Sequence, residues 1–198
     1  MQVNEIVNLL TRRAPDALNL LQRTYGSDPM LQSFVLGEDE ADVTVPRLQL
    51  GRDLALAGLK ESAALSSEAT RRLAARISFG LKLQLITQIL TTIAGIGVIT
   101  SLAKSNTSIA TWLALGSVVS SISGVLAQWM MSSKGTSDIA VSDRYARLTA
   151  DEVKISRLIR ELQVFQPIRI DDKAELTRLI NEANGLIEEV WTLSRTVT

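Results

Sequence analysis

The pattern of hydrophobic and polar residues is helical along most of the chain, but in the middle the polar positions almost disappear. Between Lys82 and Lys134 the only charged side chain is Lys104. It separates two apolar runs, residues 83–103 and residues 109–131. Because an α-helix rises about 1.5 Å per residue, each run is long enough to cross the roughly 30 Å hydrocarbon core of a bilayer. Two such runs joined by a short polar turn predict a transmembrane helical hairpin.

The flanks of this hairpin (residues 83–133) agree with a membrane location. Aromatic side chains, which favour the headgroup level, stand near the ends of the runs as expected membrane-interface anchors: Phe79, Trp112 and Trp129. Basic residues lie on both sides of the hairpin, whereas the turn carries one: Arg71, Arg72, Arg76 and Lys82 before it, and Lys134, Arg144 and Arg147 after it. This asymmetry predicts that both termini lie in the cytoplasm and the turn outside. The expected location is the inner (cell) membrane. The alternative is a soluble helical protein that hides an apolar hairpin, as some pore-forming toxins do before insertion.

The residues before the hairpin divide into three segments. Residues 1–37 read as a small cluster of short helices that docks either onto the rest of the chain or onto a partner, such as a sensor protein. Residues 38–46 form an acidic linker, for which a solvated segment is favoured over a cation site. Residues 47–82 are predicted to form a cytoplasmic helix that runs without a proline into the membrane, although Gly51 and Gly58 each cost about 1 kcal/mol relative to alanine.

Residues 134–198 are predicted to form a cytoplasmic helical hairpin or coiled coil. Gln166-Pro167 ends its first helix, and Asp172 with Glu175 forms a capping box for the second. In that second helix apolar residues repeat at spacings of three and four, which is typical of a coiled-coil seam: Leu176, Leu179, Ala183, Leu186, Val190 and Leu193. The seam pairs either with the preceding helix or with another subunit. The fold class is therefore all-α, a transmembrane hairpin with long cytoplasmic helical extensions.

Composition excludes several kinds of chemistry. The chain has 198 residues, 21 basic and 21 acidic side chains, and neither cysteine nor histidine. This removes disulfides, thiolate nucleophiles, imidazole bases and most transition-metal sites. No phosphate-binding glycine loop or nucleophile elbow is found. We therefore expect no catalytic residue, no metal and no cofactor, and the balanced charge argues against a nucleic-acid partner.

The most informative polar residues lie inside the apolar runs. A helical wheel places one polar stripe on the first run, made of Gln84, Gln88, Thr91 and Gly95. The second run carries a small-residue ladder with neighbouring polar groups: Gly116, Ser117, Ser120, Ser121, Gly124 and Gln128. Amides that faced lipid would lack hydrogen-bond partners, at several kcal/mol each. These faces therefore hold the two helices together, or they line a pore or a subunit seam between several hairpins.

A long helix that enters a two-helix membrane hairpin and is followed by a helical tail resembles the SLATT-type two-transmembrane effector domains of bacterial conflict and anti-phage systems. The resemblance lies in architecture and hydropathy, over about Arg71 to Phe165. It implies a pore-forming or membrane-disrupting effector that assembles as a homo-oligomer on command.

Two hypotheses from different classes follow. The first is an effector that oligomerises through its helical flanks and hairpins and permeabilises the inner membrane in a defence or cell-suicide system. The second is a non-conducting membrane anchor or scaffold that recruits a partner through residues 1–37. Replacing Gln84 and Gln88 with leucine distinguishes them, because a channel should lose conductance whereas a scaffold should keep partner binding.

Overall fold

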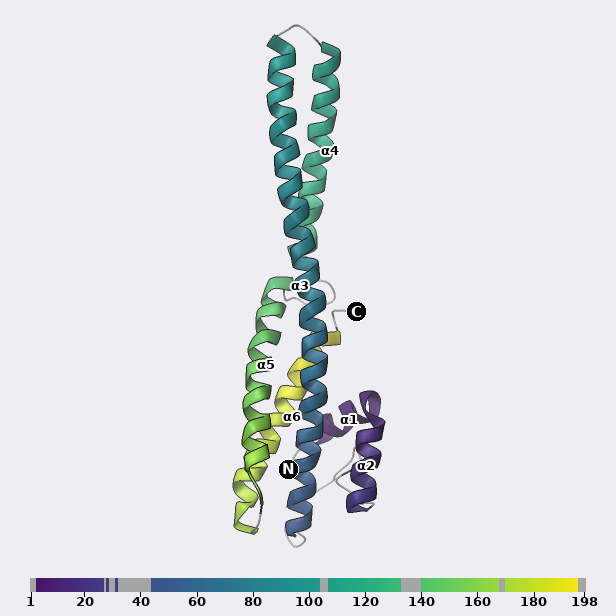
Figure 1. The fold of residues 1–198 in the computed structure, drawn as a ribbon, viewed down its shortest axis with the longest axis vertical. Helices are drawn as coiled ribbons and strands as arrows, with labels where there is room; N and C mark the ends of the chain where they lie inside the picture. The colour runs from purple at the N-terminus through teal and green to yellow at the C-terminus, as the bar shows by residue number, and fades with distance from the viewer. Residues whose placement is uncertain are drawn as a thin grey trace. The chain divides into compact units, whose positions relative to one another are not determined.

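The computed structural model describes residues 3–26, 28, 31, 44–103, 107–132, 140–167 and 170–195, and these residues form helices and no strand. The predicted all-α fold is confirmed. In chain order the elements are α1 (Asn4–Arg13), α2 (Pro15–Tyr25), α3 (Val45–Ala103), α4 (Thr107–Ser132), α5 (Val141–Val164), the 3-10 turn η3 (Ile170–Asp172) and α6 (Lys173–Arg195) (Figure 1).

The chain divides into two compact units. One, here called the helical bundle, contains Met1–Thr70 and Ala146–Thr198; the other, here called the apolar hairpin, contains Arg71–Tyr145. Helix α3 contributes its first part to the bundle and its second part to the hairpin. Its 59 residues contain a proline only in the first turn, where the missing N–H has no intrahelical partner to lose.

The core of the bundle is built by α1, α3, α5 and α6, which lie side by side in Figure 1. Every member of the predicted seam on α6 is buried there: Leu176, Leu179, Ala183, Leu186, Val190 and Leu193. These side chains pack inside the chain, so the seam does not lie open to another subunit in this structure. The sequence left open whether the seam pairs with the preceding helix or with another subunit; in the structure its side chains are buried inside the bundle, where α1 is one neighbour of α6.

Helix α1 docks onto α6 through an unusual cap. The residue before α1, Val3, provides no side-chain hydrogen bond to the free N–H groups of the first turn. Instead the side-chain oxygen of Asn184, in the middle of α6, accepts hydrogen bonds from the N–H of Glu5 at 3.1 Å and of Ile6 at 3.4 Å. A helix start needs such partners, and here another helix supplies them. The start of residues 1–37 therefore docks within the chain.

Replacing Asn184 with alanine should lower the free energy of unfolding of the bundle by about 1–2 kcal/mol, because it removes an N-terminal cap and leaves two N–H groups without a partner. Asn184→Asp keeps an acceptor oxygen at the positive end of α1 and should recover most of this loss. Chemical denaturation of the three proteins measures the difference. Equal loss in both variants would show that the cap does not contribute.

Further polar contacts fix the remaining helices of the bundle. The Arg52 Nε donates to the backbone oxygen of Leu162 at 2.9 Å, near the C-terminal end of α5 where carbonyls lack helical partners.

The Tyr25 hydroxyl at the end of α2 donates to Asp53 at 2.6 Å. Burial, this hydrogen bond and the nearby carboxylate charge raise the pKa of Tyr25 to about 12. The neutral hydroxyl thus stabilises the bundle below its ordinary pKa of 10, and the contribution is lost as the pH rises through 12.

Two predicted boundaries need correction. Helix α3 begins at Val45, so residues 45 and 46 belong to the helix and not to the acidic linker 38–46. The reason is that Pro46 is acceptable in a first helical turn. The acidic residues 38–42 lie outside the described residues, as do residues 133–139 after the hairpin. Helix α4 covers Thr107–Ser132 and is slightly longer than the predicted run 109–131.

Candidate functional site

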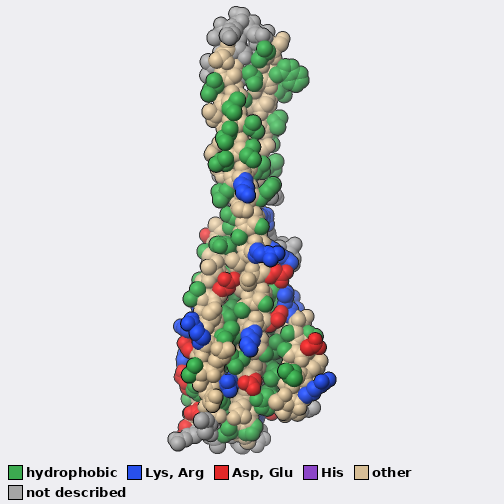
Figure 2. Space-filling model, viewed as in Figure 1, with side chains coloured by type: hydrophobic (Ala, Val, Ile, Leu, Met, Phe, Trp, Pro, Cys, Tyr) green, Lys and Arg blue, Asp and Glu red, His purple; other side chains and the backbone are tan. Residues whose placement is uncertain are grey.

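The apolar hairpin presents an aliphatic surface to its surroundings. Figure 2 shows hydrophobic side chains along the described part of its two long helices, where few charged side chains are seen. Large side chains on both helices are more than half exposed, among them Leu85, Ile89, Ile93, Ile96, Leu115, Val119, Ile122 and Val125. Continuous apolar surfaces that extend along two helices are rare on soluble monomers, and they mark surfaces that contact protein or lipid.

The length and hydropathy of the helices are also those of a membrane-associated segment. The described residues contain one helix that is long and apolar enough to cross a bilayer, Val45–Gly97, and only 17% of its most apolar window is buried. A second, shorter apolar helical segment covers Thr111–Leu126. A buried core helix of a soluble protein would have this window covered by other side chains. The exposure of the window therefore favours membrane association over the hidden-hairpin alternative.

Hydroxyl groups hold the two helices of the hairpin together. The Ser120 side chain is buried, its hydroxyl donates to the backbone oxygen of Thr87 at 2.9 Å, and it lies 2.9 Å from the hydroxyl of Thr91. The Thr91 hydroxyl also donates to the Thr87 backbone oxygen at 2.8 Å, so the three residues form one cluster. Such hydrogen bonds between apolar helices fix which faces meet.

Close backbone approach occurs at two glycines of the hairpin and not at two others. A methyl group on Gly97 would lie 2.7 Å from Leu113 Cδ1, and one on Gly124 would lie 3.1 Å from Thr87 Cγ2. Around Gly95 and Gly116 the space is open. Thr91, Ser120 and Gly124 thus meet as predicted residues of one interface.

The contact between the two helices contains only part of the predicted faces. Gly95 and Gly116 do not lie in it, while Thr87 and Gly97 do, although neither was predicted. A helical wheel considers only the polarity of side chains. It could not show that the backbone oxygen of Thr87 and the glycine at position 97 take part in the contact. Ser117 and Ser121 bond to backbone oxygens of their own helix, Ala114 and Ser117 respectively.

The two glutamines stand in a groove along one side of the hairpin. The groove has a volume of about 600 Å³ and is lined by both helices, through Gln84, Thr87, Gln88, Thr91, Thr92, Ser121, Gly124 and Val125. Three of its hydroxyls bond to backbone oxygens of their own helix: Thr91 to Thr87 at 2.8 Å, Thr92 to Gln88 at 2.9 Å and Ser121 to Ser117 at 2.8 Å. Gln88 is exposed and Gln84 is half-buried. Neither side-chain amide has a hydrogen bond to another described residue. We call this feature the glutamine groove.

The predicted interface anchors are found at the hairpin surface where their side chains are described. Trp112 is 76% exposed and Phe79 is 56% exposed. The side chains of Trp129 and Gln128 lie outside the described residues. Arg71, Arg72, Arg76 and Lys82 are exposed, as expected of basic residues that flank a membrane segment.

Arg144 differs from the other described basic residues of the hairpin unit because its side chain is buried, at 3% exposure. Burial, together with the charge of Arg76, lowers the pKa of its guanidinium.

Comparison of the chain with protein-family models, with curated proteins and with solved structures found no match.

Proposed function

We propose that this chain is a membrane effector. In this proposal the apolar hairpin crosses the inner membrane as two antiparallel helices with both termini in the cytoplasm, copies associate through the glutamine groove, and the assembly permeabilises the membrane. The resemblance to SLATT-type effector domains suggests a bacterial defence or cell-suicide system as its setting. A single two-helix hairpin cannot surround water, so permeabilisation requires several copies.

The observation that carries the proposal is the glutamine groove on an otherwise aliphatic surface. A primary amide contains both donors and an acceptor, so two copies of the same groove can satisfy each other. In the hydrocarbon core an unpaired amide costs several kcal/mol, whereas in water it costs little. Once the hairpin is inserted, pairing of the amides between copies removes this free-energy cost. Insertion therefore favours assembly.

The fold also limits the surfaces through which copies of the chain can associate. The seam on α6 is occupied inside the bundle, so it does not supply the subunit contact. The hairpin seam around Thr87, Thr91 and Ser120 is likewise occupied within one chain. The groove around Gln84 and Gln88, in contrast, stays open.

Replacing both Gln84 and Gln88 with leucine should reduce dye release from vesicles, and loss of membrane potential in expressing cells, by about tenfold or more, because a transmembrane amide contact is worth about 1–2 kcal/mol and each subunit loses two. The matched control is Thr100→Val, since this exposed hydroxyl bonds only within its own helix, to Ile96 and Gly97.

Assembly is measured separately from leakage. Because the chain has no cysteine, a single Val125→Cys reporter in the groove should form disulfide-linked dimers in membranes, and Ile93→Cys outside the groove should do so far less. The leucine double variant should lose the Val125→Cys dimer. Dimers without leakage would indicate a non-conducting scaffold and would overturn the effector proposal.

A further inference from the structure

The two units of the chain carry opposite net charges. The apolar hairpin, Arg71–Tyr145, contains seven basic and two acidic residues and has a net charge of +5. The helical bundle contains 14 basic and 19 acidic residues and has a net charge of −5. The balanced charge of the whole chain is therefore the sum of a positive unit and a negative unit.

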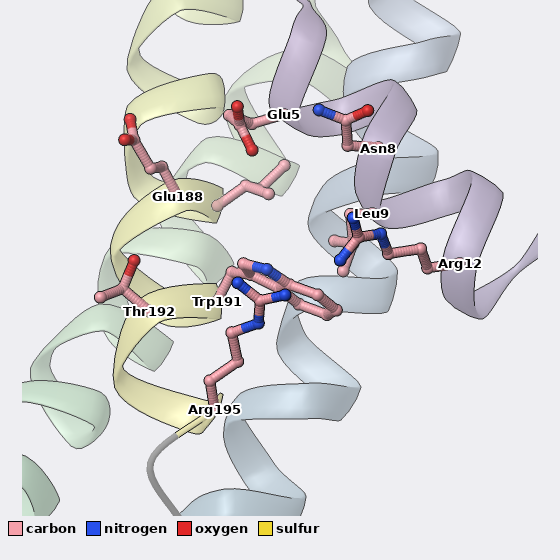
Figure 3. Close-up of a pocket in the computed structure, with 9 residues that line it drawn as sticks. Glu5, Asn8, Leu9, Arg12, Glu188, Trp191, Thr192 and Arg195 are labelled. Carbon is pink, nitrogen blue, oxygen red and sulfur yellow. The ribbon is translucent and has the colours of Figure 1, made fainter. Parts of the chain in front are cut away.

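In the bundle, charges of both signs occur together. The pocket between α1 and α6 is an example, because Glu5 and Glu188 line it together with Arg12 and Arg195 (Figure 3). The guanidinium carbons of the two arginines lie 5.8 Å and 5.3 Å from the centre of the Trp191 ring. Mixed charges of this kind largely cancel at a distance.

In the apolar hairpin, the positive charge is concentrated at one place. Four of its seven basic residues fall within residues 71–82 of α3, and all four are exposed: Arg71, Arg72, Arg76 and Lys82. The sequence from residue 69 to residue 137 contains no acidic residue. Among the described residues of this unit the one carboxylate is Asp143, in the first turn of α5. We call residues 71–82 the basic band.

Phe79 lies inside the basic band with a cation on either side. Arg76 precedes it by three residues and Lys82 follows it by three, so the three side chains are neighbours on one face of the helix. The phenyl ring is 56% exposed. Arg76 and Lys82 form no hydrogen bond or ion pair with another described residue. This face therefore combines an exposed aromatic ring with two cations whose N–H groups are open to a ligand.

The basic band has the length of a membrane interface. Lys82 directly precedes the apolar run, and its side chain extends toward the start of the helix, away from the hydrocarbon core. From residue 71 to residue 83 the helix rises about 18 Å. The headgroup layer on one side of a bilayer is about 5–8 Å thick, and the potential of an anionic surface decays over about 10 Å beyond it. These two distances together cover most of the band.

We propose that the basic band selects phospholipids with a net negative charge over zwitterionic phospholipids in the leaflet where it lies. Arg76 and Lys82 supply the cations that contact the headgroups, and Phe79 holds the band at the headgroup level. A zwitterionic headgroup offers the same phosphate but adds a cation of its own, which the band repels. This inference rests on the proposed insertion of the apolar hairpin, and it adds a lipid specificity to it.

A tryptophan at position 79 reports which lipids lie beside the band. The full-length protein with Phe79→Trp, and with phenylalanine in place of Trp112, Trp129 and Trp191, contains a single tryptophan. It is reconstituted in mixtures of phosphatidylcholine and phosphatidylglycerol, one of which is brominated near the carboxyl end of an acyl chain. Bromine quenches a neighbouring tryptophan, so the two mixtures give the relative binding constant of the two lipids. We expect phosphatidylglycerol to be favoured about fivefold, as one basic residue near an anionic surface provides.

Charge variants locate the source of this preference. Arg76→Gln combined with Lys82→Gln should reduce it to within about twofold, whereas Arg76→Lys combined with Lys82→Arg should retain it. The matched control, Arg23→Gln combined with Lys60→Gln, removes two exposed charges from the bundle and should leave the preference unchanged. Raising the salt concentration to about 1 M should weaken it, because the Debye length falls to about 3 Å. Circular dichroism checks that each variant stays helical.

The outcomes separate this inference from the proposed function. Equal quenching by the two brominated lipids would overturn the lipid selectivity and leave the hairpin in the membrane. A preference that survives Arg76→Gln with Lys82→Gln would also overturn it, since another part of the chain would then select the lipid. Quenching by neither lipid would show that position 79 does not reach the bilayer, and both the insertion and the selectivity would fall.

Discussion

Replacing Gly58 with leucine is expected to unfold the helical bundle or to lower its free energy of unfolding by on the order of 3–5 kcal/mol. A methyl group at this position would lie 2.6 Å from Ile6 Cγ2 and 3.1 Å from Ile187 Cδ1. The first of these atoms is attached directly to a branched Cβ and cannot swing away as the end of a long side chain can. Any side chain here must therefore push α1 off the surface of α3.

The change also acts on a second contact. Ile6 belongs to the first turn of α1, whose N–H groups are bonded to Asn184. If α1 moves away from α3, the two hydrogen bonds from Glu5 and Ile6 stretch as well. Loss of packing and loss of the cap are thus coupled, which is why the expected effect exceeds that of an ordinary core substitution.

Gly185 in α6 is the matched control. It also lies inside a helix, but a methyl group there would meet no atom within 4 Å. Gly185→Ala should therefore stabilise the bundle by about 0.5–1 kcal/mol through helix propensity alone. Urea unfolding followed by Trp191 fluorescence, in the protein with Trp112→Phe and Trp129→Phe, compares the variants. Opposite signs for the two positions are the expected result, and a stabilising change at Gly58 would contradict the packing described here.

Periodicity predicted the helical bundle well. The three- and four-residue spacing from Leu176 to Leu193 identified a stripe of which each member is buried. What spacing could not decide is the partner of the stripe, because a seam within a chain and a seam between chains have the same pattern. Gly58 illustrates a second limit. In sequence it is a helix-weakening residue, and only the position of Ile6 shows that the missing side chain makes room for α1.

The hairpin was predicted from the absence of charge, a signal that needs no tertiary information. Its contact face was predicted less completely. Thr91, Ser120 and Gly124 meet, whereas a methyl group on Gly95 or Gly116 would meet no atom within 4 Å. Whether a glycine lies in the contact depends on which residue of the other helix is opposite it, and the local sequence does not show this. The contacts of Arg12 and Arg195 with the Trp191 ring had no sequence signal at all, since the two arginines are 183 residues apart and carry no motif.

A double variant with Thr91→Cys and Ser120→Cys should form an intramolecular disulfide in nearly every molecule. The hydroxyl oxygens that the two sulfurs replace lie 2.9 Å apart, so the two side chains already meet across the helix contact, as a disulfide requires. The chain contains no other cysteine, so the product is unambiguous. The measurement is the mobility shift of the oxidised protein on a denaturing gel, which reduction should reverse.

The control for this experiment is the pair Gly95→Cys and Gly116→Cys, on the stripe and the ladder that the sequence predicted. Neither position has atoms of the other helix nearby, so this pair should give little intramolecular product under the same oxidation. Cross-linking of the control pair with none at Thr91 and Ser120 would mean that the helices meet through the faces the sequence suggested. In that case Gln84 and Gln88 would also turn toward the partner helix, the groove would close, and the chain would lose the open amide surface through which we propose that it assembles.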